Sequence, residues 1–339
     1  MTQFNDRSHT QPLSGATTRL WQEIARLACI AIAYWLIVRL GRLFVVQPEG
    51  IASIWPASGL ALAVLLLNPR RQWIKLLAVF FLINAVGNWS SGNSLPVSLG
   101  FALANILESV LAAWTLEYFC KSKIYFGRAV EMFALLGVAI FSNGFTALIG
   151  AAVPVLAFSA PILDTWLILW TSDGLGMLLV TPVIVTWVTS RDILQSMSPR
   201  RLVEALLLTL ALAVFAWLLF GQFTIAEKPF LRNYMIFPIL IWLAFRFGPR
   251  GITSALSLFA AIAIWNTLQG YGIFAFAYQS QTEHLVSVQL FLNVVAFSGL
   301  LLSAMVTERK RVEELLHERA AELQTIMDTV PAVVSIAHD

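Results

Sequence analysis

Ten apolar stretches, separated by short polar clusters, follow one another along this chain of 339 residues. A helix of about 20 apolar residues crosses the hydrocarbon core of a bilayer, where only helices and closed barrels can pair all of their backbone groups. With 58% hydrophobic and 12% charged residues, the chain is therefore predicted to be an all-α, polytopic helical membrane protein of about ten spans. The stretches are residues 21–38, 54–67, 73–88, 97–119, 129–157, 162–188, 202–220, 233–247, 251–269 and 285–306.

The basic residues indicate how the spans are oriented. Of the 22 Lys and Arg residues, all but four lie in segments that this assignment places on one side of the membrane. Short cytoplasmic loops carry an excess of Lys and Arg, so both termini are expected in the cytoplasm. Residues 1–18 are polar and lack the cleavage pattern of a signal peptide, which predicts a retained cytoplasmic tail. The four residues on the other side are Arg39, Arg42, Lys228 and Arg232.

The second stretch is too short for an ordinary span. A polar turn, Trp55-Pro-Ala-Ser-Gly59, opens an apolar run that ends before Asn68. We expect this element to be tilted, partly unwound at Trp55-Pro56, or re-entrant, and irregular backbone at that depth must line a cavity. The alternative is an ordinary junction between a loop and a helix, with Pro56 at the first helical position.

Polar side chains inside the spans mark the candidate ligand-binding residues, because each is costly at the bilayer centre unless it faces a partner or water. Glu108 and Asp173 lie near the middle of their spans, at similar depth, and Asn105 shares a helix face with Glu108. The alternative is that these groups only join helices by hydrogen bonds. The candidate residues, which outline a polar funnel that opens outward, are Trp55, Ser58, Asn84, Asn88, Asn105, Glu108, Asn143 and Asp173.

Four short motifs stand in order along the spans. They are Ile54-Trp-Pro-Ala-Ser-Gly-Leu-Ala61, Asn105-Ile-Leu-Glu108, Trp170-Thr-Ser-Asp-Gly-Leu-Gly176 with Thr181-Pro182, and Gln269-Gly-Tyr-Gly-Ile-Phe274. With them, residues 19–306 resemble the bacterial membrane-associated sensor domain of the first type, the MASE family. The resemblance implies an inner-membrane input module, usually of eight or more spans, ahead of histidine kinases or of GGDEF/EAL cyclic-di-GMP enzymes. It implies no particular ligand.

Beyond the last span, residues 307–326 are charged and contain neither Gly nor Pro. We expect a cytoplasmic signalling helix that continues from that span. Its apolar residues alternate in spacings of four and three around Arg319, which predicts a coiled-coil seam of about three heptads and hence a parallel homodimer. A solvated amphipathic helix that caps the membrane domain is the alternative. The seam residues are Val312, Leu316, Leu323, Ile326 and Val330.

Residues 327–339 resemble the start of a PAS domain, with a helix ending at Val330-Pro331 and a first strand at 332–337. One strand cannot close a sheet, so we expect a longer signalling protein whose remaining part carries any enzyme activity. This chain has no catalytic, cofactor or metal motif, and Cys29 and Cys120 have no partnered histidines. It is therefore predicted to be non-enzymatic and to bind no cofactor or metal.

Two function classes remain after these exclusions. The net charge of +3, spread over short clusters beside apolar runs, gives no support for a nucleic-acid partner. The expected partners are the lipid bilayer and an unknown small ligand or membrane partner. A sensor that passes ligand occupancy to the C-terminal helix is favoured over a carrier that moves a small polar solute with its intramembrane carboxylates.

Overall fold

The computed structural model describes residues 14–46, 51–189, 198–221, 233–272, 274 and 281–329. This part of the chain is almost entirely helical, so the all-α class is confirmed. The only strands among the described residues are β1 (Val45–Val46) and β2 (Ile51–Ala52), an antiparallel pair. The long helices are α1 (Ser14–Arg42), α2 (Pro56–Leu66), α3 (Trp73–Trp89), α4 (Leu95–Cys120), α5 (Ala129–Gly137), α6 (Asn143–Phe158), α7 (Ile162–Thr189), α8 (Pro199–Phe220), α9 (Ile236–Leu268) and α11 (Gln281–Thr329).

Each of the ten predicted stretches falls largely in helical backbone. Seven described helices are long and apolar enough to cross a membrane, while α3 has 17 residues and α2 only 11. The stretch at 129–157 is α5 and α6 joined by a π-helical turn, η2 (Val138–Ser142). Helix α1 already begins at Ser14, so the last residues of the predicted polar tail are helical.

The stretches at 233–247 and 251–269 are the two limbs of α9, preceded by the 3-10 turn η5 (Asn233–Met235). Gly248 between them has φ 61° and ψ −157°, a conformation that glycine adopts without steric cost, and Pro249 follows it. The first limb ends where Arg246 pairs with Glu204 near the start of α8, at 2.8 Å. The second limb returns to pack the Phe259 ring on Phe220 at the end of α8. The two limbs are therefore antiparallel.

Basic residues of several helices gather at one end of the bundle, called the basic end here. At the other end, Arg42 of α1 donates hydrogen bonds to the Gly87 carbonyl and the Ser91 hydroxyl. The spans thus alternate in direction as expected, and the cytoplasmic location of the basic end stays a prediction. The basic end includes the 3-10 turn η1 (Arg70–Gln72). Hydrogen bonds and ion pairs connect neighbouring elements there, namely Arg26–Gln72, Lys75–Glu23, Arg70–Glu117, Arg246–Glu204, Ala129–Glu308 and Lys310–Phe245.

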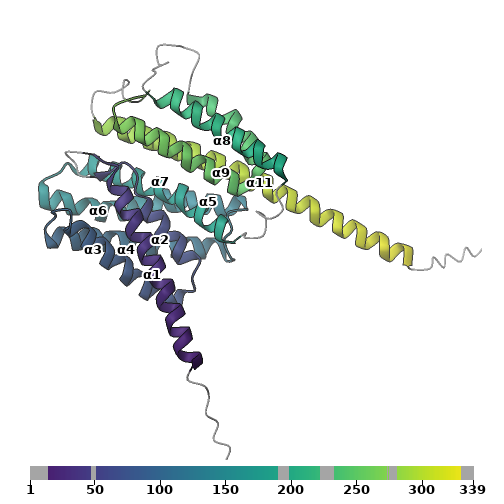
Figure 1. The fold of residues 1–339 in the computed structure, drawn as a ribbon, viewed down its shortest axis with the longest axis horizontal. Coiled ribbons are helices and arrows are strands. Elements are labelled where there is room, and N and C mark those ends of the chain that lie inside the picture. The colour runs from purple at the N-terminus through teal and green to yellow at the C-terminus, as the bar shows by residue number, and fades with distance from the viewer. Residues whose placement is uncertain are drawn as a thin grey trace, which may run out of the picture.

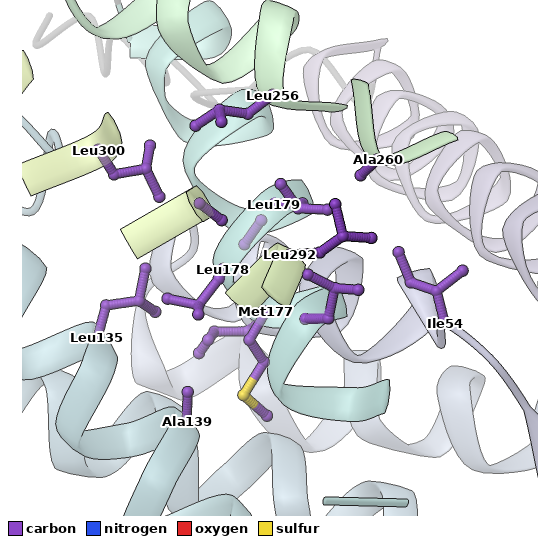
Figure 2. Packing of buried hydrophobic residues seen from close by; sticks show 14 of the residues in the cluster. Ile54, Leu135, Ala139, Met177, Leu178, Leu179, Leu256, Ala260, Leu292 and Leu300 are labelled. Carbon is purple, nitrogen blue, oxygen red and sulfur yellow. The ribbon is translucent and has the colours of Figure 1, made fainter. Parts of the chain in front are cut away.

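Helix α7 lies at the centre of the bundle. In its most apolar 18-residue window 72% of the residues are buried, against 17% in the corresponding windows of α1 and α8. Met177, Leu178 and Leu179 of α7 share one apolar cluster with residues of α5, α9 and α11, as Figure 2 shows. Large apolar side chains also cover the outside of the bundle, for example Leu156, which is 86% exposed. Such a surface is expected of helices that face lipid.

Helix α11 extends far beyond the bundle at its C-terminal end, as the yellow helix in Figure 1 shows. Its first part packs against α9, α7 and α5, and every described side chain from Arg309 to Met327 is exposed. The predicted continuous helix at 307–326 is confirmed, and it runs on to Thr329. Val330 and the predicted PAS strand lie outside the described residues.

Candidate functional site

Helix α2 forms the second half of a span whose first half is unwound. Residues 52–54 are buried although they are not helical, and the α2 helix begins only at Pro56. Eleven residues of helix cover about 16 Å, roughly half of the hydrocarbon core. The Ser53 N–H donates to the Phe44 carbonyl near the end of α1, while Trp73 near the basic end donates to the Leu65 carbonyl. The segment therefore runs from one end of the bundle to the other and is unwound before Pro56, which is one of the three forms expected from the sequence.

The backbone of this unwound segment has partners on two other helices. The Ser172 hydroxyl of α7 donates to the Ala52 carbonyl at 2.8 Å, and the Trp55 N–H donates to the Ser172 carbonyl at 3.4 Å. The Gln289 amide of α11 donates to the Ser53 carbonyl at 2.8 Å. Irregular backbone at membrane depth is tolerated only when it is paired in this way.

Two glycines let α2 and α7 approach closely. A Cβ atom on Gly59 would collide with the Gly176 carbonyl oxygen, and one on Gly176 would collide with the Trp55 carbonyl oxygen. The Thr181 hydroxyl of α7 also donates to the Gly59 carbonyl at 2.9 Å. Small residues allow this approach, which brings the N-terminus of α2 beside the middle of α7.

The first turn of α2 meets Glu108 of α4. The Ser58 hydroxyl donates to Oε2 of Glu108 at 3.0 Å, while Oε1 has no hydrogen-bond partner. Glu108 is 4% exposed and Asp173 is 8% exposed. On α7, Asp173 directly follows Ser172, whose hydroxyl and carbonyl groups bond the unwound segment before α2, so the second acid also lies close to the N-terminus of α2. We call Ser58, Glu108 and Asp173 the acid pocket.

Other predicted residues form a separate amide network beside the acid pocket. Asn105 of α4 donates to Oδ1 of Asn84 at 3.2 Å, and Asn84 of α3 donates to the Tyr34 hydroxyl of α1 at 2.6 Å. Asn88 donates to the Asn84 carbonyl within its own helix. These bonds join α1, α3 and α4, as the helix-joining alternative predicts for amides.

Trp55 and Asn143 take different positions from these groups. The Trp55 ring lies over Gly41 of α1 and is half-buried. Asn143, at the start of α6, donates to the Trp170 carbonyl of α7 at 2.7 Å, and its own Oδ1 has no partner. Of the eight candidate residues, the structure therefore brings Ser58, Glu108 and Asp173 into one group.

The MASE1 family model matches residues 25–310, which is most of the chain. The chain belongs to the MASE1 family. MASE1 is a membrane-associated sensory domain of signalling proteins and is not a catalytic domain. No curated protein matches the chain, and no solved structure does. Among the described residues, no group of three or more His, Cys, Asp or Glu side chains could hold a metal ion.

Sequence reasoning missed two residues of α11 in the MASE1 domain, Gln289 and Asn293. The Thr171 hydroxyl of α7 donates to Oε1 of Gln289 at 2.6 Å, and Asn293 donates to the Thr171 carbonyl at 3.1 Å. Gln289 is completely buried. A signal was available, because two amides four residues apart inside an apolar stretch is the pattern that singled out Asn84 and Asn88.

The MASE1 domain also holds α11 where this helix leaves the bundle. Glu308 accepts a hydrogen bond from the Ala129 N–H at the start of α5, at 3.1 Å, and Lys310 donates to the Phe245 carbonyl before the break in α9, at 3.0 Å. We call these two bonds the exit clamp. A carboxylate at a helix N-terminus is favourable because it pairs with free N–H groups and with the helix dipole.

The loop in front of α5 is itself ordered by a buried acid. Glu131 is completely buried and accepts hydrogen bonds from the backbone of Gly127 and from the Arg128 guanidinium. The hydrogen bond with Glu131 raises the pKa of Arg128 above its usual range, so the guanidinium stays charged. The N-terminus of α5 is thereby positioned against Glu308.

Proposed function

We propose that this MASE1 domain detects a small ligand in the acid pocket and passes the signal to α11, which carries it out of the membrane. The proposal extends the established sensory role of the family to a particular site and a particular route. It rests on one observation: Gln289 of α11 bonds both to the unwound segment before α2 and to α7, the two elements beside the acid pocket. Its amide N–H reaches the unwound segment at Ser53, and its carbonyl oxygen accepts from Thr171.

The route from pocket to helix is short. Thr171 lies two residues before Asp173 on α7, and Ser53 lies five residues before Ser58. A ligand that changes the spacing between α2 and α7 changes the distance between the two groups that Gln289 joins. One rigid helix then leads from Gln289 to the exit clamp and beyond. A ligand biases such a system only if it binds two arrangements of these helices with different affinity.

The output follows from the exposed end of α11. We propose that residues 307–326 pair with a second copy of the chain in the cytoplasm and regulate a PAS or catalytic domain, such as a histidine kinase or a cyclic-di-GMP enzyme. In this proposal the domain lies in the bacterial inner membrane with both termini in the cytoplasm. The excess of basic residues at the basic end supports that orientation.

Cysteine crosslinking of α11 tests the coupling without knowledge of the ligand. In a background with Cys29→Ser and Cys120→Ser, Leu316→Cys reports pairing between two copies in native membranes. We expect Gln289→Leu, Glu108→Gln and Asp173→Asn to change the crosslinked fraction by roughly twofold or more, because each alters the balance between helix arrangements. Leu290→Ala, a change at the exposed neighbour of Gln289, is the control. An unchanged crosslinked fraction in the Gln289, Glu108 and Asp173 variants, at normal levels of protein in the membrane, would falsify the coupling.

One observation favours a second function, a carrier. Broken helices that form the substrate site are a recurring feature of secondary transporters, and α2 is such a helix, with Glu108 bonded to its first turn. Solute flux into proteoliposomes that depends on Glu108 and Asp173 would establish transport and contradict a purely sensory role. The bonds between Gln289 and both sides of the pocket favour the sensor, because a carrier has no need for an output helix.

A further inference from the structure

Buried hydrogen-bond acceptors that lack donors among the described residues lie in the acid pocket and at the start of α6. Oε1 of Glu108 and Oδ1 of Asn143 are both buried without a partner. No hydrogen-bond donor of a described residue reaches the Asp173 carboxylate, although only 8% of this residue is exposed. Buried polar atoms normally have partners, so acceptors without donors at two neighbouring acids require an explanation.

The geometry of α7 indicates the direction in which Asp173 projects. Successive residues of a helix are rotated by about 100°, so Asp173 projects between the face of α7 that holds Ser172 and the face that holds Trp170 and Gly174. Ser172 bonds the unwound segment before α2, and the Trp170 carbonyl accepts from Asn143. Asp173 therefore projects between α2 and the start of α6, the sector in which Glu108 of α4 meets Ser58. The π-helical turn η2 borders the same space, and such turns are frequent at functional sites.

The charges in this space do not balance. The Ser58 hydroxyl is the one described side chain that donates to either carboxylate. The N-terminus of α2 contributes about half a positive charge, which offsets part of the charge of Glu108. No Lys, Arg or His among the described residues bonds to Glu108 or Asp173. Buried charge without compensation is strongly unfavourable.

We infer that the acid pocket binds a single positive charge, shared between Glu108 and Asp173. This inference rests on the proposed sensory function and specifies the class of ligand. The chemistry fits a proton, a monovalent metal ion or a primary ammonium group, since each can be held by carboxylate and hydroxyl oxygens. An anion has too few donors here, and a divalent metal ion takes six or more oxygen ligands or a third strong ligand.

Cation titrations of the full chain in lipid nanodiscs test the metal and ammonium forms. The unfolding midpoint is measured in NaCl, KCl or methylammonium chloride, with choline chloride keeping the ionic strength constant. A ligand that binds only the folded state raises the midpoint with the logarithm of its concentration. We expect this dependence to disappear in Glu108→Gln and in Asp173→Asn. Asp164→Asn, the same substitution at an exposed position of α7, should keep it.

Infrared difference spectroscopy tests the proton form. If the charge is a proton, none of the three cations shifts the midpoint, and the C=O stretch of a protonated carboxyl appears and is lost in Asp173→Asn or Glu108→Gln. The absence of both signals, with the carboxylates ionised and no response to the cations, overturns the inference. The wild-type titration and spectrum need no variant, so they remain informative if a variant fails to fold. Changed crosslinking at residue 316 together with neither charge signal would leave the proposed sensor standing and remove only the cation.

Discussion

Helix α2 and the end of α11 are opposite kinds of helix in one chain. Ten of the eleven residues of α2, Pro56 to Leu65, are buried, and neighbouring helices pair the unwound backbone before it. From Arg309 to Met327, every side chain of α11 is exposed in the described part of the chain. Val312, Leu316, Leu323 and Ile326 are between 50% and 65% exposed there.

The contacts of α2 are all made within one chain, whereas the apolar seam of α11 has none in the described part of the chain. The conformation of α2 depends on contacts made within the bundle, so the site beside it is built before any partner binds. The apolar seam of α11 has no cover in the described chain, and an isolated amphipathic helix gains most of its stability from packing. We therefore expect substitutions around α2 to alter folding, and substitutions along α11 to alter association.

The largest effect is expected from Gly176→Ala. The added Cβ would overlap the Trp55 carbonyl oxygen, which belongs to the backbone and cannot move aside as a side chain can. Forcing extra volume into such a contact costs about 1 to 3 kcal/mol or more. An SDS titration of the purified chain should show a loss of stability of that size.

Gly137→Ala is the matched control for that experiment. Gly137 is also helical, but a Cβ there meets no atom within 4 Å. Alanine is favoured over glycine in a helix by roughly 0.5 to 1 kcal/mol, so stability should stay the same or rise. Equal behaviour of the two variants would contradict the close approach of α2 and α7.

The sequence predicted the general form of α2 and of the acid pocket but not the contacts between the helices. The stretch at 54–67 is too short for a full helical span, which predicted a tilted, partly unwound or re-entrant element, and the structure has the unwound form. The mid-span positions of Glu108 and Asp173 predicted their depth. The bond from Ser58 to Glu108 could not be predicted, because it depends on which face of α4 meets α2. Side-chain periodicity shows which residues share a face, but it does not show which helix the face contacts.

Two breaks in helices show which features the sequence reveals and which it does not. The break at Gly248 agrees with the predicted boundary of two stretches, because Pro249 disrupts a helix in a way that sequence reveals. The π-helical turn η2 has no such marker, and apolar residues run through it without interruption. Gln289 was missed although a buried amide requires partners just as a buried charge does.

An intermediate effect is expected from Arg319→Leu on the exposed side of the comparison. Arg319 pairs with Glu322 of the same helix at 2.9 Å, and both side chains are more than 60% exposed. In a parallel dimer two Arg319 residues would face each other in the seam, and leucine removes this repulsion and adds buried apolar surface. We expect dimerisation to become about tenfold tighter, a gain of about 1.4 kcal/mol.

Crosslinking through cysteine at two positions measures that change. Leu316→Cys reports the seam, and Ala321→Cys reports the opposite face of the same helix. Arg319→Leu should raise the yield at 316 and leave the yield at 321 low. Equal yields at both positions would show that no seam exists and that α11 remains a solvated helix.

The smallest effect is expected at the exit clamp, where the buried bundle and the exposed helix meet. Glu308→Gln keeps a hydrogen-bond acceptor for the Ala129 N–H but removes the negative charge from the N-terminus of α5. Such a charge is worth about 0.3 to 1 kcal/mol at a helix terminus, so global stability should fall by no more than that. Glu313→Gln is the control, since Glu313 pairs only with Arg309 four residues earlier on an exposed face.

Because the clamp holds α11 where it leaves the bundle, Glu308→Gln should change spin-label mobility at position 312 without changing it at position 290. Unchanged mobility at position 312 would mean that the clamp does not restrain the helix, and that α11 is held by its packing inside the bundle alone.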